Sequence, residues 1–144
     1  MGKSVITRET TLRLWPLGYV VVYGVTSWGT LFAASVNPEE FDITPGSLKV
    51  SDTESDGIYK KKMTFRTPLT DKSREIVLAS IQENRLVAMY SDERGVDRLF
   101  GSPQWPATLT WVSNGGSAEV TITATGDRPN RRAIPYVATG LSLT

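Results

Sequence analysis

The sequence predicts a mainly β fold, an antiparallel β-sandwich or barrel with one amphipathic α-helix at about residues 71–83. Apolar residues alternate with threonines in residues 108–111 and 120–125, which is typical of antiparallel strands with one face on a core and one in water. The segment between these runs, Ser-Asn-Gly-Gly-Ser, tolerates positive φ and should join them as a β-hairpin. Residues 86–90 are apolar at nearly every position, which predicts a central strand covered on both faces.

The predicted helix has a capping signal and an apolar face. Thr70 or Asp71 can accept hydrogen bonds from the free amides of its first turn, and Val77, Leu78 and Ile81 recur at helical spacing. A single amphipathic helix beside six or more strands should cover an open face or end of the sheet.

The chain reads as a single domain, 1–144, with an ambiguous hairpin or arm at about residues 5–36 and a C-terminal extension at about 126–144. The N-terminal part should form two or three strands, with a turn at residues 27–29. Such a hairpin can belong to the core, or it can protrude and pair with a neighbouring subunit. Apolar runs are usually buried, which favours the core, but the alternation does not decide between the two.

The middle of the chain alternates connections and short strands. Residues 37–46 predict an ordered connection, residues 47–50 a short strand, and residues 51–57 an exposed, mobile loop. Asp52, Glu54 and Asp56 stand at alternate positions, as in a calcium loop, but the later bidentate Glu is missing, which favours a plain solvated loop. A strand of about eight residues follows from Ile58. Its Lys61 falls on the apolar side, where the stem should lie along the core edge with the ammonium in water.

Composition excludes several classes of site. Without Cys or His the chain has no disulfides, thiolate nucleophiles, Cys/His zinc sites or histidine bases, and we expect no cofactor. Asp92 and Asp97 could serve a carboxylate enzyme, but acids beside a turn glycine are ordinary turn chemistry, so we expect no enzyme.

The net charge is +1, and the longest apolar stretch is about half of the ~20 residues that span a bilayer. A soluble protein of a reducing compartment, or one made there, without a membrane anchor, is expected.

Several turn and strand signatures resemble small virion proteins from phages and prophages of Bacteroidetes-type hosts. The similarity covers about residues 40–136 and rests on Gly57-Ile58-Tyr59, a helix, residues 90–95, residues 99–103, Pro106-Ala107, the glycine-rich hairpin and Pro135-Tyr136. The resemblance implies a tail or head-to-tail connector subunit of tail tube, terminator or completion type, acting in a ring. It implies a location in the virion after synthesis in the bacterial host cytoplasm, with copies of itself and other virion proteins as partners. It carries no catalytic residues.

Charged residues are the candidates for a subunit interface or for transient, non-specific contact with DNA: Lys60, Lys61, Lys62, Arg128, Arg131 and Arg132, with Asp52, Glu54 and Asp56 as the complementary acids. The lysines could also simply protect a strand edge.

The alternative function is a carbohydrate- or single-stranded-nucleic-acid-binding module with stacking platforms at Trp15, Trp28, Trp105 and Trp111. We expect an oligomeric ring, and a core in which the following are buried together: Phe65, Leu78, Val87, Met89, Trp111, Val120 and Ile122.

Overall fold

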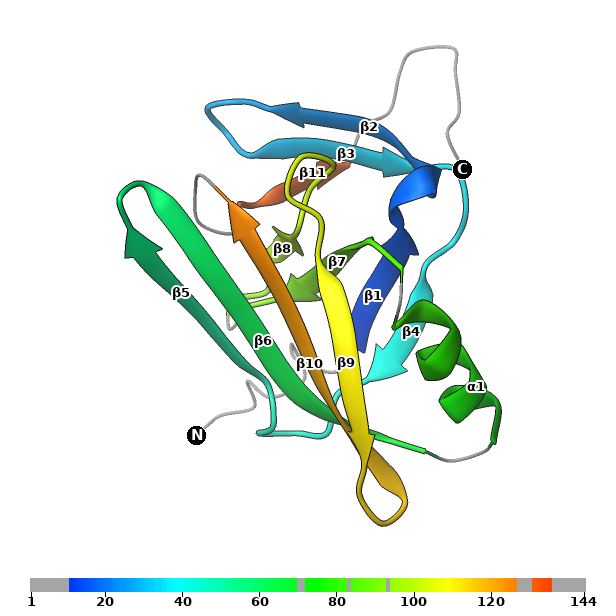
Figure 1. Ribbon diagram of the computed structural model, residues 1–144. Helices are drawn as coiled ribbons and strands as arrows, with labels where there is room; N and C mark the ends of the chain where they lie inside the picture. The colour runs from blue at the N-terminus through cyan, green and yellow to red at the C-terminus, as the bar shows by residue number, and fades with distance from the viewer. Residues whose placement is uncertain (1–10, 70–71, 83, 93, 127–130, 136–144) are drawn as a thin grey trace.

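The computed structural model of the chain describes residues 11–69, 72–82, 84–92, 94–126 and 131–135. These residues form strands and one α-helix (Figure 1). The elements follow in the order β1 (Thr11–Pro16), a 3-10 helix η2 (Leu17–Tyr19), β2 (Val20–Val25), β3 (Thr30–Ala34), β4 (Glu39–Asp42), β5 (Lys49–Ser55), β6 (Ile58–Pro68), α1 (Lys72–Ile81), β7 (Leu86–Ser91), β8 (Asp97–Phe100), β9 (Thr108–Ser113), β10 (Ser117–Gly126) and β11 (Ala133–Pro135). None of the described helical residues form a segment long and apolar enough to cross a membrane.

The strands make three sheets that lie in layers. The long sheet has the order β5-β6-β10-β9, the middle sheet β4-β1-β7-β8, and the small sheet β11-β3-β2. All neighbours are antiparallel except β11 and β3, which run parallel. The predicted mainly β fold with one helix is confirmed, and the described strands form sandwich-like sheets with no closed barrel.

The first core lies between the long and middle sheets. Met63, Phe65, Val120 and Ile122 point inward from β6 and β10 because alternate residues of a strand share a face. The helix α1 adds Leu78 and Ile81 to this core and lies beside β4 (Figure 1).

A second core lies on the other side of the middle sheet, against the small sheet. Every residue from Leu86 to Tyr90 is buried, so the central strand is confirmed. Val87 and Met89 join Trp15 and Phe32 in the second core, however, because they face away from their neighbours on β7. The prediction that they share one core with Ile122 is therefore wrong.

The predicted hairpin and helix are both present. β9 and β10 pair through Gly115 and Gly116, which have φ of 57° and 88°, and Asn114 N–H donates to the carbonyl of Ser117 at 2.7 Å. Two positive φ angles in a two-residue turn match the right-handed twist of the strands. The helix α1 falls within the predicted residues 71–83, and its expected caps, Thr70 and Asp71, lie outside the described residues.

Two predicted connections contain strands. The expected mobile loop at residues 51–57 is mostly β5, which continues to Ser55 and pairs with β6 along its whole length. Its residues are exposed, as predicted, but an Asp56-Gly57 turn with φ of 54° and 81° converts the segment into a hairpin. The expected connection at residues 37–46 contains β4, an edge strand whose Phe41 is buried against the first core.

Both end segments of the described chain are strands within the sheets: β1 in the middle sheet and β11 in the small sheet. Within the ambiguous N-terminal segment, β1 lies between β4 and β7, and the β2–β3 hairpin covers the second core. In the predicted C-terminal extension, the residues before and in β11 join two sheets: Leu99 N–H donates to the Arg131 carbonyl at 3.0 Å, and Thr30 N–H donates to the Arg132 carbonyl at 2.8 Å. We call residues 131–135 the strap.

Candidate interaction surfaces

The predicted basic residues do not form one patch. Lys60 and Lys62 point outward from β6, whereas Lys61 lies opposite Ala124 on the inward side and is 8% exposed. The predicted placement of Lys61 on the apolar side of the strand is confirmed, and little of the residue reaches water. Arg131 and Arg132 belong to the strap, and Arg128 lies outside the described residues.

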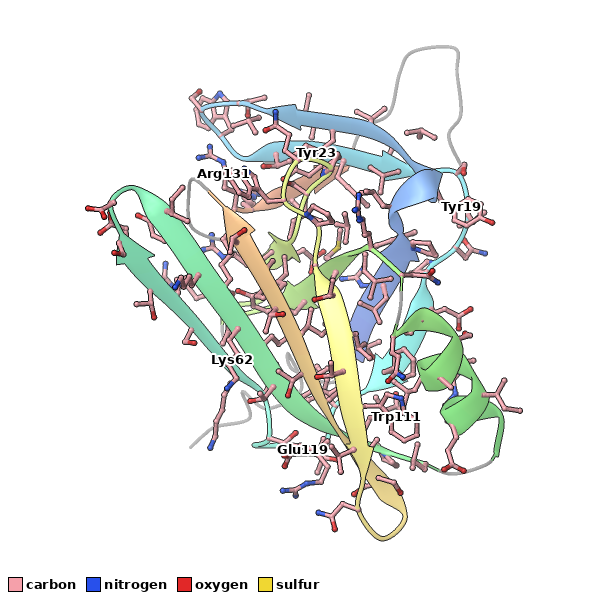
Figure 2. All side chains as sticks on the ribbon, viewed as in Figure 1. Tyr19, Tyr23, Lys62, Trp111, Glu119 and Arg131 are labelled. Carbon is pink, nitrogen blue, oxygen red and sulfur yellow. The ribbon has the colours of Figure 1, made fainter. Side chains whose placement is uncertain are left out.

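Lys60 and Lys62 belong to the side of the long sheet that faces away from the first core, which we call the outer face. Strand register places the following residues on it: Lys49, Ser51, Thr53, Lys60, Lys62, Thr64, Arg66, Thr108, Thr110, Val112, Glu119, Thr121, Thr123 and Thr125. Its charged groups are four cations and one acid, Glu119. Figure 2 shows Lys62 pointing away from the sandwich. The outer face is therefore a basic, hydroxyl-rich surface.

A shallow groove of about 540 Å³ crosses part of the outer face. Hydroxyl groups and lysines line it, among them Thr53, Lys60, Lys62 and Thr123. Ammonium and hydroxyl groups suit the oxygens of phosphate, but the residues of the outer face include no aromatic side chain on which a base or sugar could stack. The groove can therefore attract a polyanion without recognising its sequence.

The predicted acidic partners lie in the same hairpin as the lysines. Asp52 is opposite Lys61 and Glu54 is opposite Tyr59 on the inward side, and Glu54 accepts a hydrogen bond from Gly57 N–H at 2.7 Å. Opposite charges on facing strands stabilise a hairpin by about 0.2–1 kcal/mol, so part of the predicted charge complementarity lies within the chain. In the described part of the chain no three Asp or Glu residues are arranged to hold a metal ion.

Asp92 and Asp97, the candidate carboxylates, both have structural contacts. Asp92 accepts hydrogen bonds from the backbone N–H groups of Arg94 and Val96, and its carboxylate lies 3.1 Å from Arg98 Nε. Burial alone would raise the pKa of Asp92, but the hydrogen bonds from Val96 and Arg94 and the charge of Arg98 outweigh it and lower the pKa below its ordinary value. Asp97 accepts from Arg13 at 3.2 Å and from Ser91 at 2.7 Å. These contacts fix the β7–β8 turn.

The β2–β3 hairpin presents an apolar surface that the sequence pattern did not locate. Val21 and Val25 are exposed on β2, which is the edge strand of the small sheet, and Trp28 at the turn is 82% exposed. Tyr19, just before β2, and Val36, just after β3, are also exposed, and we call these five residues the apolar hairpin. The outer edge of β2 pairs with no other strand among the described residues, and an exposed apolar strand with such an edge is suited to contact with another chain.

Comparisons with protein-family models, curated proteins and solved structures found no match to this chain.

The four tryptophans do not share a surface. Trp15 is buried and packs edge-to-face on Phe32, with ring centroids 4.9 Å apart. Trp111 is partly buried against the first core, between β9 and α1 (Figure 2), and Trp105 is half-buried in the turn after β8. This arrangement leaves Trp28 as the one largely exposed indole of the four, so they form no common stacking platform.

Proposed function

We propose that this protein is a ring-forming structural subunit of a phage virion, of the tail or head-to-tail connector type. The apolar hairpin carries the proposal, because Val21, Val25 and Trp28 are exposed on or beside β2, whose outer edge pairs with no described strand. Burial of apolar surface stabilises association by roughly 25 cal/mol per Å², and a free strand edge offers backbone hydrogen bonds to a neighbour. The sandwich-like fold and the resemblance of residues 40–136 support the same class.

The arrangement of surfaces also supports a ring. The small sheet, with the apolar hairpin, and the long sheet, with the basic outer face, cover opposite sides of the middle sheet (Figure 1). A subunit in a closed ring needs surfaces for its neighbours that are distinct from the surface toward the lumen. We assign the apolar hairpin to the neighbour and the outer face to transient contact with DNA.

Native mass spectrometry with negative-stain imaging tests the proposal. The wild-type protein should form a cyclic oligomer, alone or with candidate connector proteins, and Trp28→Ser with Val21→Ser should abolish it. The matched control is Ile76→Ser on α1, where a 64% exposed apolar residue lies away from the hairpin. A wild type that stays monomeric at high concentration and adds no mass with connector proteins would refute the proposal, as would loss of assembly in the control.

The role of the outer face is tested by the pair Lys60→Glu and Lys62→Glu. Lys61 is left unchanged because reversing a buried charge would disturb the fold itself. If the outer face meets DNA, assembly persists and the slope of log affinity against log salt falls by up to about 0.9 per lysine removed. If these lysines instead bind a neighbouring subunit, assembly fails and reversal of Asp52 and Glu54 partly restores it. No change in either measurement would leave the lysines with a role in solubility.

The alternative function, a carbohydrate- or nucleic-acid-binding module, finds less support. Such modules stack bases or sugars on aromatic rings, and the tryptophans of this chain are divided between the two cores, a turn and the apolar hairpin. Specific binding of an oligosaccharide or an oligonucleotide that Trp28→Ser removes, with no oligomer formed, would favour it.

A further inference from the structure

We propose that the outer face binds one backbone strand of duplex DNA along β6, with one phosphate beside each of its four cations. We call this row of cations the track. In order along β6 it consists of Lys60, Lys62, Lys49 and Arg66. This inference rests on the proposed contact between the outer face and DNA, and it adds the path that the DNA takes.

The four cations of the track occupy successive rows of the long sheet. Lys60, Lys62 and Arg66 point outward from β6 itself. Lys49 of β5 lies opposite Thr64, which is the one outward residue in this part of β6 that carries no charge. Neighbouring rows are two residues apart along a strand, or roughly 6.6–6.8 Å. This spacing is close to the distance between neighbouring phosphates along one strand of duplex DNA, so the track can contact consecutive phosphates.

The cations of the track are available to a ligand. All four are exposed, and none of them forms an ion pair with another described residue. The acids of the β5–β6 hairpin, Asp52 and Glu54, lie on the opposite side of the sheet. The one acid of the outer face, Glu119, lies opposite Arg66, and Figure 2 shows it nearer the β9–β10 turn than Lys62. Negative charge therefore accompanies only one end of the track.

Two hollows follow one another along the track. The groove of about 540 Å³ contains the first two cations. A second hollow, of about 370 Å³, contains the other two together with Thr64. One of its walls is the turn at Pro45 and Gly46, which the N–H of Ser47 closes by donating to the carbonyl of Thr44 at 3.0 Å. A backbone laid along β6 passes through both hollows, where hydroxyl groups beside the cations can donate to phosphate oxygens.

The chemistry of the outer face selects duplex DNA over a single strand. Proteins that hold single strands stack the bases on aromatic side chains, and the described residues of the outer face include none. In a duplex the bases pair with each other, so contacts to the phosphates alone are sufficient to position it. Thr121, Thr123 and Thr125 of β10 lie beside the track and add hydroxyl groups for the same strand. The contact therefore reads no base sequence.

Fluorescence anisotropy with a labelled DNA duplex of arbitrary sequence tests the track, with salt varied from about 20 to 200 mM. Single neutral substitutions along the track should each lower the salt slope by up to about 0.9 and weaken binding roughly five- to tenfold at about 0.1 M salt. These variants are Lys49→Gln, Lys60→Gln, Lys62→Gln and Arg66→Gln. The control is Arg94→Gln, an exposed cation of the β7–β8 turn, which should bind as the wild type does. Absence of binding by the wild type, or an equal loss in the control, would overturn the proposal.

A relocated charge separates the track from general attraction to a positive surface. Lys62→Thr with Thr123→Lys moves one charge to the opposite residue on β10 and leaves the net charge unchanged. The track predicts the same loss as in Lys62→Gln, because the row along β6 is interrupted. Wild-type affinity in this double variant and in a second one, Lys60→Thr with Thr125→Lys, would overturn the track and leave only a diffuse contact with DNA.

Further measurements identify the source of a failure. Urea unfolding shows which variants are folded, and all of the exchanged residues are exposed, so each variant should unfold as the wild type does. Single-stranded DNA of the same length should bind more weakly than the duplex, and equal or tighter binding of it would overturn the choice of duplex. Native mass spectrometry follows ring assembly separately. A protein that assembles but does not distinguish the relocated charges contradicts the track alone, whereas a monomer that distinguishes them supports the track and contradicts the ring.

Discussion

Ile122→Ala should be among the most destabilising single substitutions in the long sheet. Ile122 is fully buried, lies between Met63 of β6 and Leu109 of β9 in the strand register, and belongs to the first core. The substitution removes three carbon groups, worth about 0.8 kcal/mol each, and leaves a cavity that the rigid sheets cannot fully close. The free energy of unfolding should fall by about 2–5 kcal/mol.

Urea denaturation measured by tryptophan fluorescence is the assay. With a slope of about 2 kcal/mol per M, the unfolding midpoint should fall by roughly 1–2.5 M. The control is Thr123→Ala, the next residue, which is exposed on the outer face and should cost no more than about 1 kcal/mol. A loss below about 0.5 kcal/mol for Ile122→Ala, or equal losses in the two variants, would show that the inward face of β10 is assigned incorrectly.

Three other substitutions test separate features by the same unfolding assay. Gly101→Ala should lower the free energy of unfolding by roughly 1–3 kcal/mol, because φ at this position is +92° and the new Cβ would lie 3.0 Å from the Cβ of Ala107. The control is Gly18→Ala, which should be nearly neutral because the space around Gly18 is open. Met89→Ala should lower the free energy of unfolding by about 2–5 kcal/mol if the second core stabilises the fold as much as the first core does. A decrease of less than about 0.5 kcal/mol would contradict this. Because the pKa of Asp92 is lowered in the folded protein, its carboxylate stabilises the fold fully above the unfolded pKa of about 3.9, and this stabilisation is lost as pH falls through the folded pKa. The difference in unfolding midpoint between wild type and Asp92→Asn should therefore vanish at low pH. A difference that persists there would exclude the charged carboxylate as its cause.

The parts of the fold that the sequence predicted are those where pattern and turn chemistry agree. Alternation in β10, the two glycines at its turn and the continuous apolar run of β7 were sufficient for the hairpin and the central strand. The helix was recognised from three apolar residues at helical spacing. The class of fold therefore followed from local signals.

Strands without an apolar pattern were not predictable in this way. β5 is polar and exposed along its length, so its composition matches a loop, and the informative signal was the Asp56-Gly57 pair, a strong hairpin sequence. β4 has a single buried apolar residue, Phe41. Hydrogen-bonded pairing with a partner strand therefore positions both strands, because neither has a continuous apolar face.

The surfaces were less predictable than the fold, because each depends on which side of a strand a residue occupies in space. Alternation placed Lys61 on the apolar side of its strand, as the register of β6 shows, but it did not show how little of the residue reaches water. Arg131 was recognised as basic, yet its contact with Thr26 joins residues far apart in the chain. The sequence marked residues 5–36 as a possible hairpin or arm, but it did not show that Val21, Val25 and Trp28 are the residues exposed there.

Because the strap follows all the strands that it joins, the order of strands along the chain affects how the protein folds during synthesis. β1 has both of its partners later in the chain, and β3 pairs with β11, the last described strand. A nascent chain that has reached β10 can form the long sheet and the first core, but the small sheet still lacks β11. The second face of the middle sheet, with Val87 and Met89, is completed only after residues 131–135 leave the ribosome. Pairings of this range fold slowly and expose apolar surface meanwhile, so newly made chains should need protection by chaperones until the strap is in place.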